Sequence, residues 1–202
     1  MRAADAVVLT CPASEQAGML ADLSEELARA LAAIPYNRIA VVAVGYRKDD
    51  TPNVPEGFGY IAPQQAKRDL LGVQWCSAIF PERAPQGYVL WRALCGGWHR
   101  ADILEWDDDR LLAAVRAELQ LALGVTATPL FHHIHRWHNA IPQYHVGHQL
   151  RLIAIEEKLQ YYPGLFLAGN AYHGVAMNDC TEQADIIAGR IRDFLAAGAK
   201  VR

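Results

Sequence analysis

The two ends of the chain share one pattern of hydrophobic and polar positions. Near the start, the β-branched apolar run Ala6 to Leu9 ends at Cys11-Pro12 and is typical of a buried strand in a parallel sheet. We expect a helix to follow this strand, with Ser24 as its N-terminal cap and Pro35 at its end. The opening of the chain is therefore expected to be a strand-turn-helix unit.

The same order returns at the other end. Leu165 to Ala168 predicts an apolar strand, Gly169-Asn170 a turn, and Asp179 to Leu195 a helix whose apolar residues face one way. Two such units supply too few strands for a parallel sheet that is covered on both faces. We therefore expect that neighbouring strands of this sheet are missing from the chain.

The middle of the chain has a different pattern. Strand-like runs are separated by Pro, Gly and Asp, which is typical of an antiparallel or mixed sheet. These runs cover residues 38–47, 57–61, 73–80, 88–95 and 128–137. Two helices are also expected, Asp107 to Leu123 with Gly124 as its stop, and a segment around Leu152 to Leu159. The elements together predict an α/β (α+β) fold, in which residues 1–36 and 137–202 form one layer and residues 37–136 another.

Composition excludes several classes of protein. The 202 residues are 52% hydrophobic and 20% charged, which indicates a soluble globular protein, and the formal net charge of -3 argues against nucleic acid as a partner. No apolar run reaches the length of a transmembrane helix, and Met1 to Asp5 lacks the layout of a signal peptide. We expect a cytoplasmic protein and leave open a peripheral contact with the membrane. The four cysteines show no spacing typical of a zinc site or a disulfide framework.

Three signals for other functions are weak. Gly57 to Ala62 fits G-x-G-x-x-A, but it follows a loop and Pro63 ends it, so it lacks the strand before and the helix after that a dinucleotide site requires. Six histidines cluster between residues 132 and 148, and His133 and His135 can share a strand face, yet no carboxylate or cysteine stands nearby at ligand spacing. No serine lies in a nucleophile elbow. We therefore predict no metal site and name no catalytic side chain.

Two motifs near the end of the chain carry a family resemblance. GLFLAGNAYHGVAMNDC, residues 164–180, resembles the C-terminal flavin-binding motif of protoporphyrinogen oxidases, and RWHNAIPQYHVGH, residues 136–148, resembles the segment before it. ADAVVLTCPA and FPERAPQGYVL, residues 4–13 and 80–90, also resemble family segments. The resemblance covers nearly the whole chain and about the last two-fifths of a typical member. It implies the fold of the FAD-dependent amine oxidases, in which a mixed-sheet substrate-binding domain interrupts a Rossmann-like FAD domain.

The resemblance also implies site residues. The cofactor-binding set for the isoalloxazine and ribityl region is Gly169, Asn170, Gly174, Val175, Met177 and Trp137. Small residues after the strand let the backbone approach the cofactor, and the next helix presents its N-terminus to the flavin or to its ribityl-phosphate arm. The family usually has arginine, glycine and proline where this chain has His173, Ala176 and Asn178. A methyl group at Ala176 would crowd the flavin if the backbone there needs positive φ or a close approach to the cofactor.

The second motif implies contacts with the substrate. Trp137, Pro142, Gln143 and Tyr144 would lie at the boundary between substrate and flavin, where aromatic faces shape a slot for a planar ring system. The residues alone equally fit an interpretation in which Trp137 and Tyr144 are ordinary interdomain core.

Two functions remain open at this point. The first is the C-terminal portion of a flavin-dependent protoporphyrinogen or coproporphyrinogen oxidase of haem biosynthesis, with the flavin carrying the chemistry. We expect this chain alone to bind FAD weakly or not at all and to be inactive, and to have an N-terminal FAD-domain polypeptide as partner or to self-associate. The alternative is a non-catalytic fragment without flavin that binds a tetrapyrrole or a protein.

Overall fold

The protein divides into two compact units. The computed structural model describes residues 4–51 and 54–199. Residues 1–3 and 200–202, which the sequence assigned to the terminal layer, lie outside the described residues. Met1–Tyr36 and Ile141–Arg202 form the terminal unit, and Asn37–Ala140 form the central unit. The division falls after residue 140 and not after 136 as the pattern indicated.

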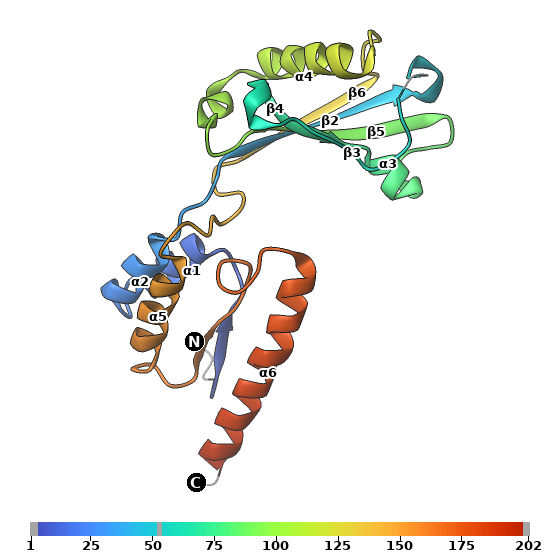
Figure 1. Ribbon diagram of the computed structural model, residues 1–202. Coiled ribbons are helices and arrows are strands. Elements are labelled where there is room, and N and C mark those ends of the chain that lie inside the picture. Colours follow the sequence, from blue (N-terminus) through green and yellow to red (C-terminus); the bar gives the residue numbers. More distant parts are fainter. Residues whose placement is uncertain (1–3, 52–53, 200–202) are drawn as a thin grey trace. The chain divides into compact units, whose positions relative to one another are not determined.

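The terminal unit holds the two short strands expected from the ends of the chain. Its elements are β1 (Val7–Leu9), α1 (Ala13–Leu20), α2 (Glu25–Ala32), α5 (His148–Leu159), β7 (Leu165–Leu167) and α6 (Met177–Ala199). β1 and β7 pair in parallel, with Val8 opposite Phe166, although more than 150 residues separate them in the sequence. Figure 1 shows the pair between α6 and the other three helices of this unit. Strands from the two ends of the chain thus pair with each other.

The core of the terminal unit lies among α1, α2, α5 and β7. Leu27, Leu31, Leu152 and Ile155 are buried there, and the Ser24 hydroxyl caps α2 by accepting a hydrogen bond from the Leu27 N–H at 3.2 Å. Helix α6 differs from the other three, because none of its side chains described for residues 177–198 is buried. An apolar helix face of this kind normally packs against another element.

The central unit is an antiparallel sheet with one long helix. Its strands are β2 (Ile39–Arg47), β3 (Gly59–Ile61), β4 (Leu70–Gln74), β5 (Tyr88–Gly96) and β6 (Phe131–Trp137), arranged in the order β3-β4-β5-β2-β6. Its helices are α3 (Cys76–Ile79) and α4 (Asp108–Leu123), with short 3₁₀ turns at Lys48–Asp50, Gln64–Ala66, Pro81–Arg83 and Ala101–Glu105. β6 runs through Trp137, which pairs with Ile39, and this pairing keeps the end of β6 in the central unit.

Helix α4 covers one face of this sheet (Figure 1). Its buried residues Leu111, Val115 and Leu119 recur at helical spacing and pack in one core with the inward residues of β2 and β5. The Asp107 carboxylate accepts a hydrogen bond from the Arg110 N–H at 2.8 Å, and Gly124 ends the helix with φ 70°. The helix expected from the sequence is confirmed, and the α/β class with it.

Two local expectations were wrong. The run 73–80 was expected to be one strand, but β4 ends at Gln74 and α3 occupies Cys76–Ile79. A short apolar run has no period that separates a strand from a helical turn. Helix α1 was not predicted, because the buried Gln16 interrupts its apolar face.

Within the Gly57 to Ala62 segment, Gly59–Ile61 forms β3, which pairs with β4, and the next element is the short 3₁₀ turn Gln64–Ala66. A Cβ atom on Gly59 would lie 2.0 Å from the Val73 carbonyl oxygen, so the glycine there serves close strand packing. That no dinucleotide binds at this segment stays a prediction from the sequence.

Candidate functional site

The turn after β7 depends on two glycines. Gly169 has φ 123°, and a Cβ atom there would lie 3.3 Å from the Thr10 carbonyl oxygen at the end of β1. Gly174 has φ 139°, and its added Cβ would lie 2.3 Å from Cβ of Asp179. Because L side chains rarely adopt such φ values, both positions favour glycine for backbone reasons. We define residues 169–176 as the β7–α6 loop.

The side chain of Tyr144 forms hydrogen bonds with two backbone groups of this loop. Its hydroxyl donates to the Asn170 carbonyl at 2.6 Å and accepts from the Gly174 N–H at 3.0 Å. Partial burial raises the pKa of Tyr144, so the hydroxyl keeps its proton at neutral pH. Of the residues predicted for the site, the structure thus brings Tyr144, Asn170 and Gly174 together.

The Tyr144 ring lies on a buried histidine. His148 is 4% exposed and stacks on Tyr144 with ring centroids 4.0 Å apart and an interplanar angle of 11°. Its Nε2 lies 3.4 Å from the Tyr172 carbonyl, an acceptor, which favours the tautomer with hydrogen on Nε2. Burial lowers the pKa of His148 most, the hydrogen bond to the Tyr172 carbonyl opposes this shift, and the charge of Arg151 adds to the lowering. The imidazole is therefore neutral at pH 7.

A buried glutamine holds the strand ends below the loop. Gln16 is fully buried, and its Nε2 donates to the carbonyl oxygens of Cys11 at 2.6 Å, Ala168 at 3.1 Å and Leu9 at 3.3 Å. The Tyr172 hydroxyl donates to Gln16 Oε1, and burial raises the pKa of Tyr172. One side chain from α1 thus joins the carboxyl ends of β1 and β7 to the loop.

A carboxylate of α6 itself, that of Asp179, caps the start of the helix. Asp179 Oδ2 accepts a hydrogen bond from the Ala176 N–H at 2.9 Å, which is half of a capping box. The negative charge of Asp179 disfavours binding of the ribityl-phosphate arm of the flavin, which the resemblance placed at this helix end as one possibility. Among the described residues only Lys67 has positive φ without being glycine, so the methyl group of Ala176 causes no such backbone strain.

The exposed apolar residues at the end of the loop and the start of α6 fit the ring end of a flavin. Val175 is exposed and Met177, the first residue of α6, is 86% exposed, beside the loop backbone whose path the two glycines allow. An apolar surface next to bare backbone suits a flat heterocycle with polar edges. The residues present therefore fit the isoalloxazine region of FAD.

The other predicted site residues lie elsewhere. Pro142 is fully buried and forms a backbone bridge with Tyr36. Gln143 donates its backbone N–H to the Pro35 carbonyl at 2.8 Å and its side-chain amide to the Ile141 carbonyl at 3.1 Å. Trp137 belongs to β6 of the central unit and is exposed beside His135. The roles of Trp137 at the cofactor and of Pro142 and Gln143 at the substrate stay predictions.

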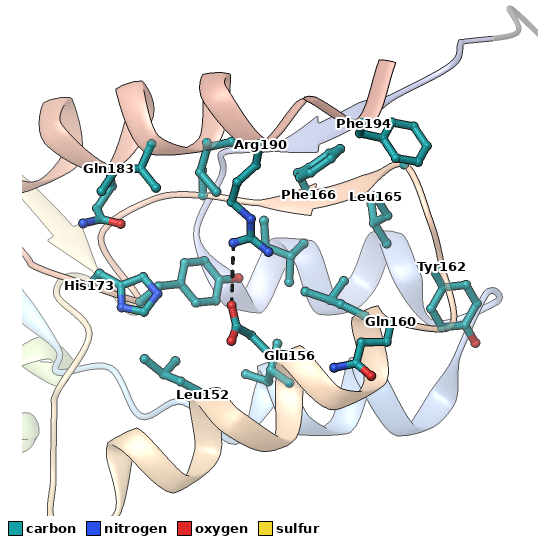
Figure 2. Close-up of a pocket in the computed structure, with 18 of the residues that line it drawn as sticks. Leu152, Glu156, Gln160, Tyr162, Leu165, Phe166, His173, Gln183, Arg190 and Phe194 are labelled. Carbon is teal, nitrogen blue, oxygen red and sulfur yellow. Dashed lines mark ion pairs between the residues drawn. The ribbon is translucent and has the colours of Figure 1, made fainter. Parts of the chain in front are cut away.

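An open groove lies along β7 in the terminal unit. Its volume is about 630 Å³, and it is lined by α5, β7, the segments beside β7, and α6. Figure 2 shows Arg190 reaching from α6 towards Glu156 of α5, where Nη1 and Oε1 are 3.6 Å apart. Phe166 and Phe194 meet edge to face at the far end, with centroids 5.9 Å apart. The groove is lined mainly by apolar side chains such as Leu152, Leu165 and Ile187.

The part of the chain that the structure describes contains neither a cluster of metal ligands nor a helix able to span a membrane. Across residues 4–51 and 54–199, no three or more His, Cys, Asp or Glu side chains are grouped so that they could hold a metal ion. None of the helices in the same part of the chain combines the length and apolar character needed to cross a membrane.

Sequence reasoning missed Gln16, His148 and Tyr172 as parts of the site. The side chain of Gln16 meets residues 152 and 156 positions away, which no local pattern records. A polar residue at a position that should face the core was the only signal for Gln16. For Tyr144 the residue was identified, but its two bonds to the loop were not.

Comparisons with known proteins match nearly the whole chain. The family described as "Flavin containing amine oxidoreductase" matches residues 2–192. Coproporphyrinogen III oxidase of Bacillus subtilis (strain 168) is 30% identical over 181 residues, covering 89% of this chain and 38% of that protein. Protoporphyrinogen oxidase 1, chloroplastic, of Arabidopsis thaliana is 34% identical over 200 residues, covering 94% and 37%.

A solved structure gives the same picture. A protein of Exiguobacterium sp. 255-15, provisionally named a protoporphyrinogen oxidase, superposes with a TM-score of 0.77 at 28% identity and covers 93% of this chain and 41% of its own. The chain thus spans about two fifths of the length of these relatives.

Proposed function

We propose a function from the premise that this chain belongs to the family of flavin containing amine oxidoreductases, as its motifs indicated. It is the C-terminal portion of an FAD-dependent porphyrinogen oxidase of haem biosynthesis, which oxidises protoporphyrinogen or coproporphyrinogen to the porphyrin. Relatives of both names match the chain at 30% identity or more, and they support the class of substrate without separating the two. The cytoplasmic location and a peripheral membrane contact stay predictions from the sequence.

The β7–α6 loop would hold the ring end of the flavin. Gly169, Asn170 and Gly174 would present their backbone to the ring edge, and the exposed Val175 and Met177 would offer apolar contact to its face. When bound, the flavin supplies the redox chemistry that removes hydrogen from the porphyrinogen. The chain's own part is to position the ring and exclude water from it. Trp137, Pro142 and Gln143 remain our candidates for the boundary with the substrate.

The apolar surface around β1 and β7 is uncovered, and this observation supports a further polypeptide as partner. Val7 is 46% and Val8 36% exposed, although such residues in a parallel sheet are normally buried. The groove along β7 lies beside α6, a helix without a buried side chain among those described. Uncovered strand edges and apolar faces recruit other chains. We propose that an N-terminal FAD-domain polypeptide covers this surface, with self-association as the competing outcome.

The first test is a titration of the purified chain with FAD. We expect a Kd in the micromolar range or weaker, because the residues present fit only the ring end and the Asp179 carboxylate disfavours a phosphate at the start of α6. Isothermal titration calorimetry and the visible flavin spectrum both report this binding. Submicromolar affinity of the chain alone would contradict the proposal that the remaining FAD contacts come from another polypeptide. Complete absence of binding, with or without such a polypeptide, would favour the flavin-free fragment.

A further inference from the structure

The hydroxyl of Tyr144 closes the β7–α6 loop between two backbone points. It donates to the carbonyl of Asn170 at 2.6 Å and accepts from the N–H of Gly174 at 3.0 Å. The three residues between these points, 171–173, form no helix or strand. A single side-chain oxygen therefore holds the path of the loop at both ends.

The Tyr144 ring is itself held by His148. The two rings stack at 4.0 Å, and His148 is buried beneath the loop, where its Nε2 lies 3.4 Å from the Tyr172 carbonyl. The pair thus meets the loop backbone at alternate residues, 170, 172 and 174. Three contacts with a short loop restrict its conformation far more than one contact does.

These contacts leave Tyr144 little capacity for another ligand. A tyrosine hydroxyl has one hydrogen to donate, and that hydrogen is already directed to the Asn170 carbonyl. One face of the ring is covered by His148. A donor role towards a substrate would require the bond that positions the loop to break.

We propose that Tyr144 is a positioning residue for the flavin loop and acts through Asn170 and Gly174, in place of the substrate contact that the family resemblance implied. The inference rests on the proposed function, because only that function makes the loop a flavin site. By fixing where the loop presents its backbone to the ring edge, the Tyr144 hydroxyl sets the affinity for the flavin and the polarity of its surroundings. The affinity for the porphyrinogen does not depend on it.

The test begins with the chain alone and the variant Tyr144→Phe, which keeps the stacked ring and removes only the hydroxyl. Amide hydrogen exchange of Gly174, followed by NMR, is expected to become about tenfold faster, since its acceptor is lost. Tyr161→Phe is the matched control, because Tyr161 is 81% exposed. Unchanged exchange at Gly174 in Tyr144→Phe would overturn the inference whether or not flavin binds.

The second readout uses the chain paired with its N-terminal FAD-domain polypeptide. Tyr144→Phe is expected to weaken flavin binding about tenfold and to shift the visible flavin bands, with an unchanged KM for porphyrinogen at saturating FAD. A raised KM with unchanged flavin affinity would identify Tyr144 as a substrate contact and overturn the inference. If the wild-type pair takes up no flavin, the proposed function fails, and the exchange of Gly174 alone then decides whether Tyr144 holds the loop.

Discussion

Replacing Gln16 with leucine (Gln16→Leu) is expected to lower the free energy of unfolding of the chain by about 3 kcal/mol. The amide of Gln16 supplies the donor for the Cys11 and Ala168 carbonyls and the acceptor for the Tyr172 hydroxyl. A leucine has nearly the same size but leaves these polar groups without their partner in a fully buried position. The loss of a buried partner costs more than the bond itself contributes.

Urea denaturation followed by far-UV circular dichroism measures this change. Gln160→Leu is the matched control, because Gln160 is exposed on the segment after α5 and is expected to change stability little. All five tryptophans lie in the central unit, so their fluorescence shows whether that unit stays folded. A Gln16→Leu chain as stable as the Gln160→Leu control would show that the buried network does not hold the strand ends.

Gly174→Ala is expected to weaken flavin binding by the paired polypeptides about a hundredfold, equal to about 2.8 kcal/mol. The added Cβ would lie 2.3 Å from Cβ of Asp179, and φ is 139°. The loop must therefore move, and the bonds from Gly174 to Tyr144 and from Ala176 to Asp179 are disturbed together. Backbone strain of this kind costs about 1–3 kcal/mol before any steric overlap is counted.

Fluorescence titration with FAD, in the pair that contains the variant, measures the loss. Gly189→Ala is the control on α6, because its added Cβ would meet nothing closer than Arg192 Nη2 at 3.8 Å. We expect that control to keep wild-type affinity. Equal affinity in both variants would show that the β7–α6 loop does not contact the flavin.

The sequence predicted those elements whose pattern is local. Helix α4 has caps at both ends and a regular apolar face, and it was predicted almost to the residue. The end strands were identified from their apolar runs, and their parallel pairing followed from the return of the same order. Helix α1 was not predicted, because Gln16 occupies a position where an apolar residue would complete the buried face of the helix. The residue is polar there because it serves backbone groups of distant strands.

The site was predicted unevenly for the same reason. Gly169 and Gly174 were found through the family motif, and the structure explains them by positive φ and close contacts. The role of Tyr144 could not be read from the motif, because its two partners lie 26 and 30 residues further along the chain. Contacts made only in the folded protein decide between a loop support and a ligand contact. Sequence spacing contains no information about them.

We propose that this chain forms a porphyrinogen oxidase together with an N-terminal FAD-domain polypeptide, and joint production of the two polypeptides tests this proposal. The chain is co-expressed and co-purified with the N-terminal polypeptide that completes the length of the family. The visible spectrum then records bound flavin, and porphyrin fluorescence records oxidation of protoporphyrinogen and of coproporphyrinogen. We predict a pair that retains FAD and forms porphyrin, while each polypeptide alone does neither at comparable rates. A folded chain that forms no complex with this polypeptide, or a complex without flavin and without porphyrin formation, would contradict the account.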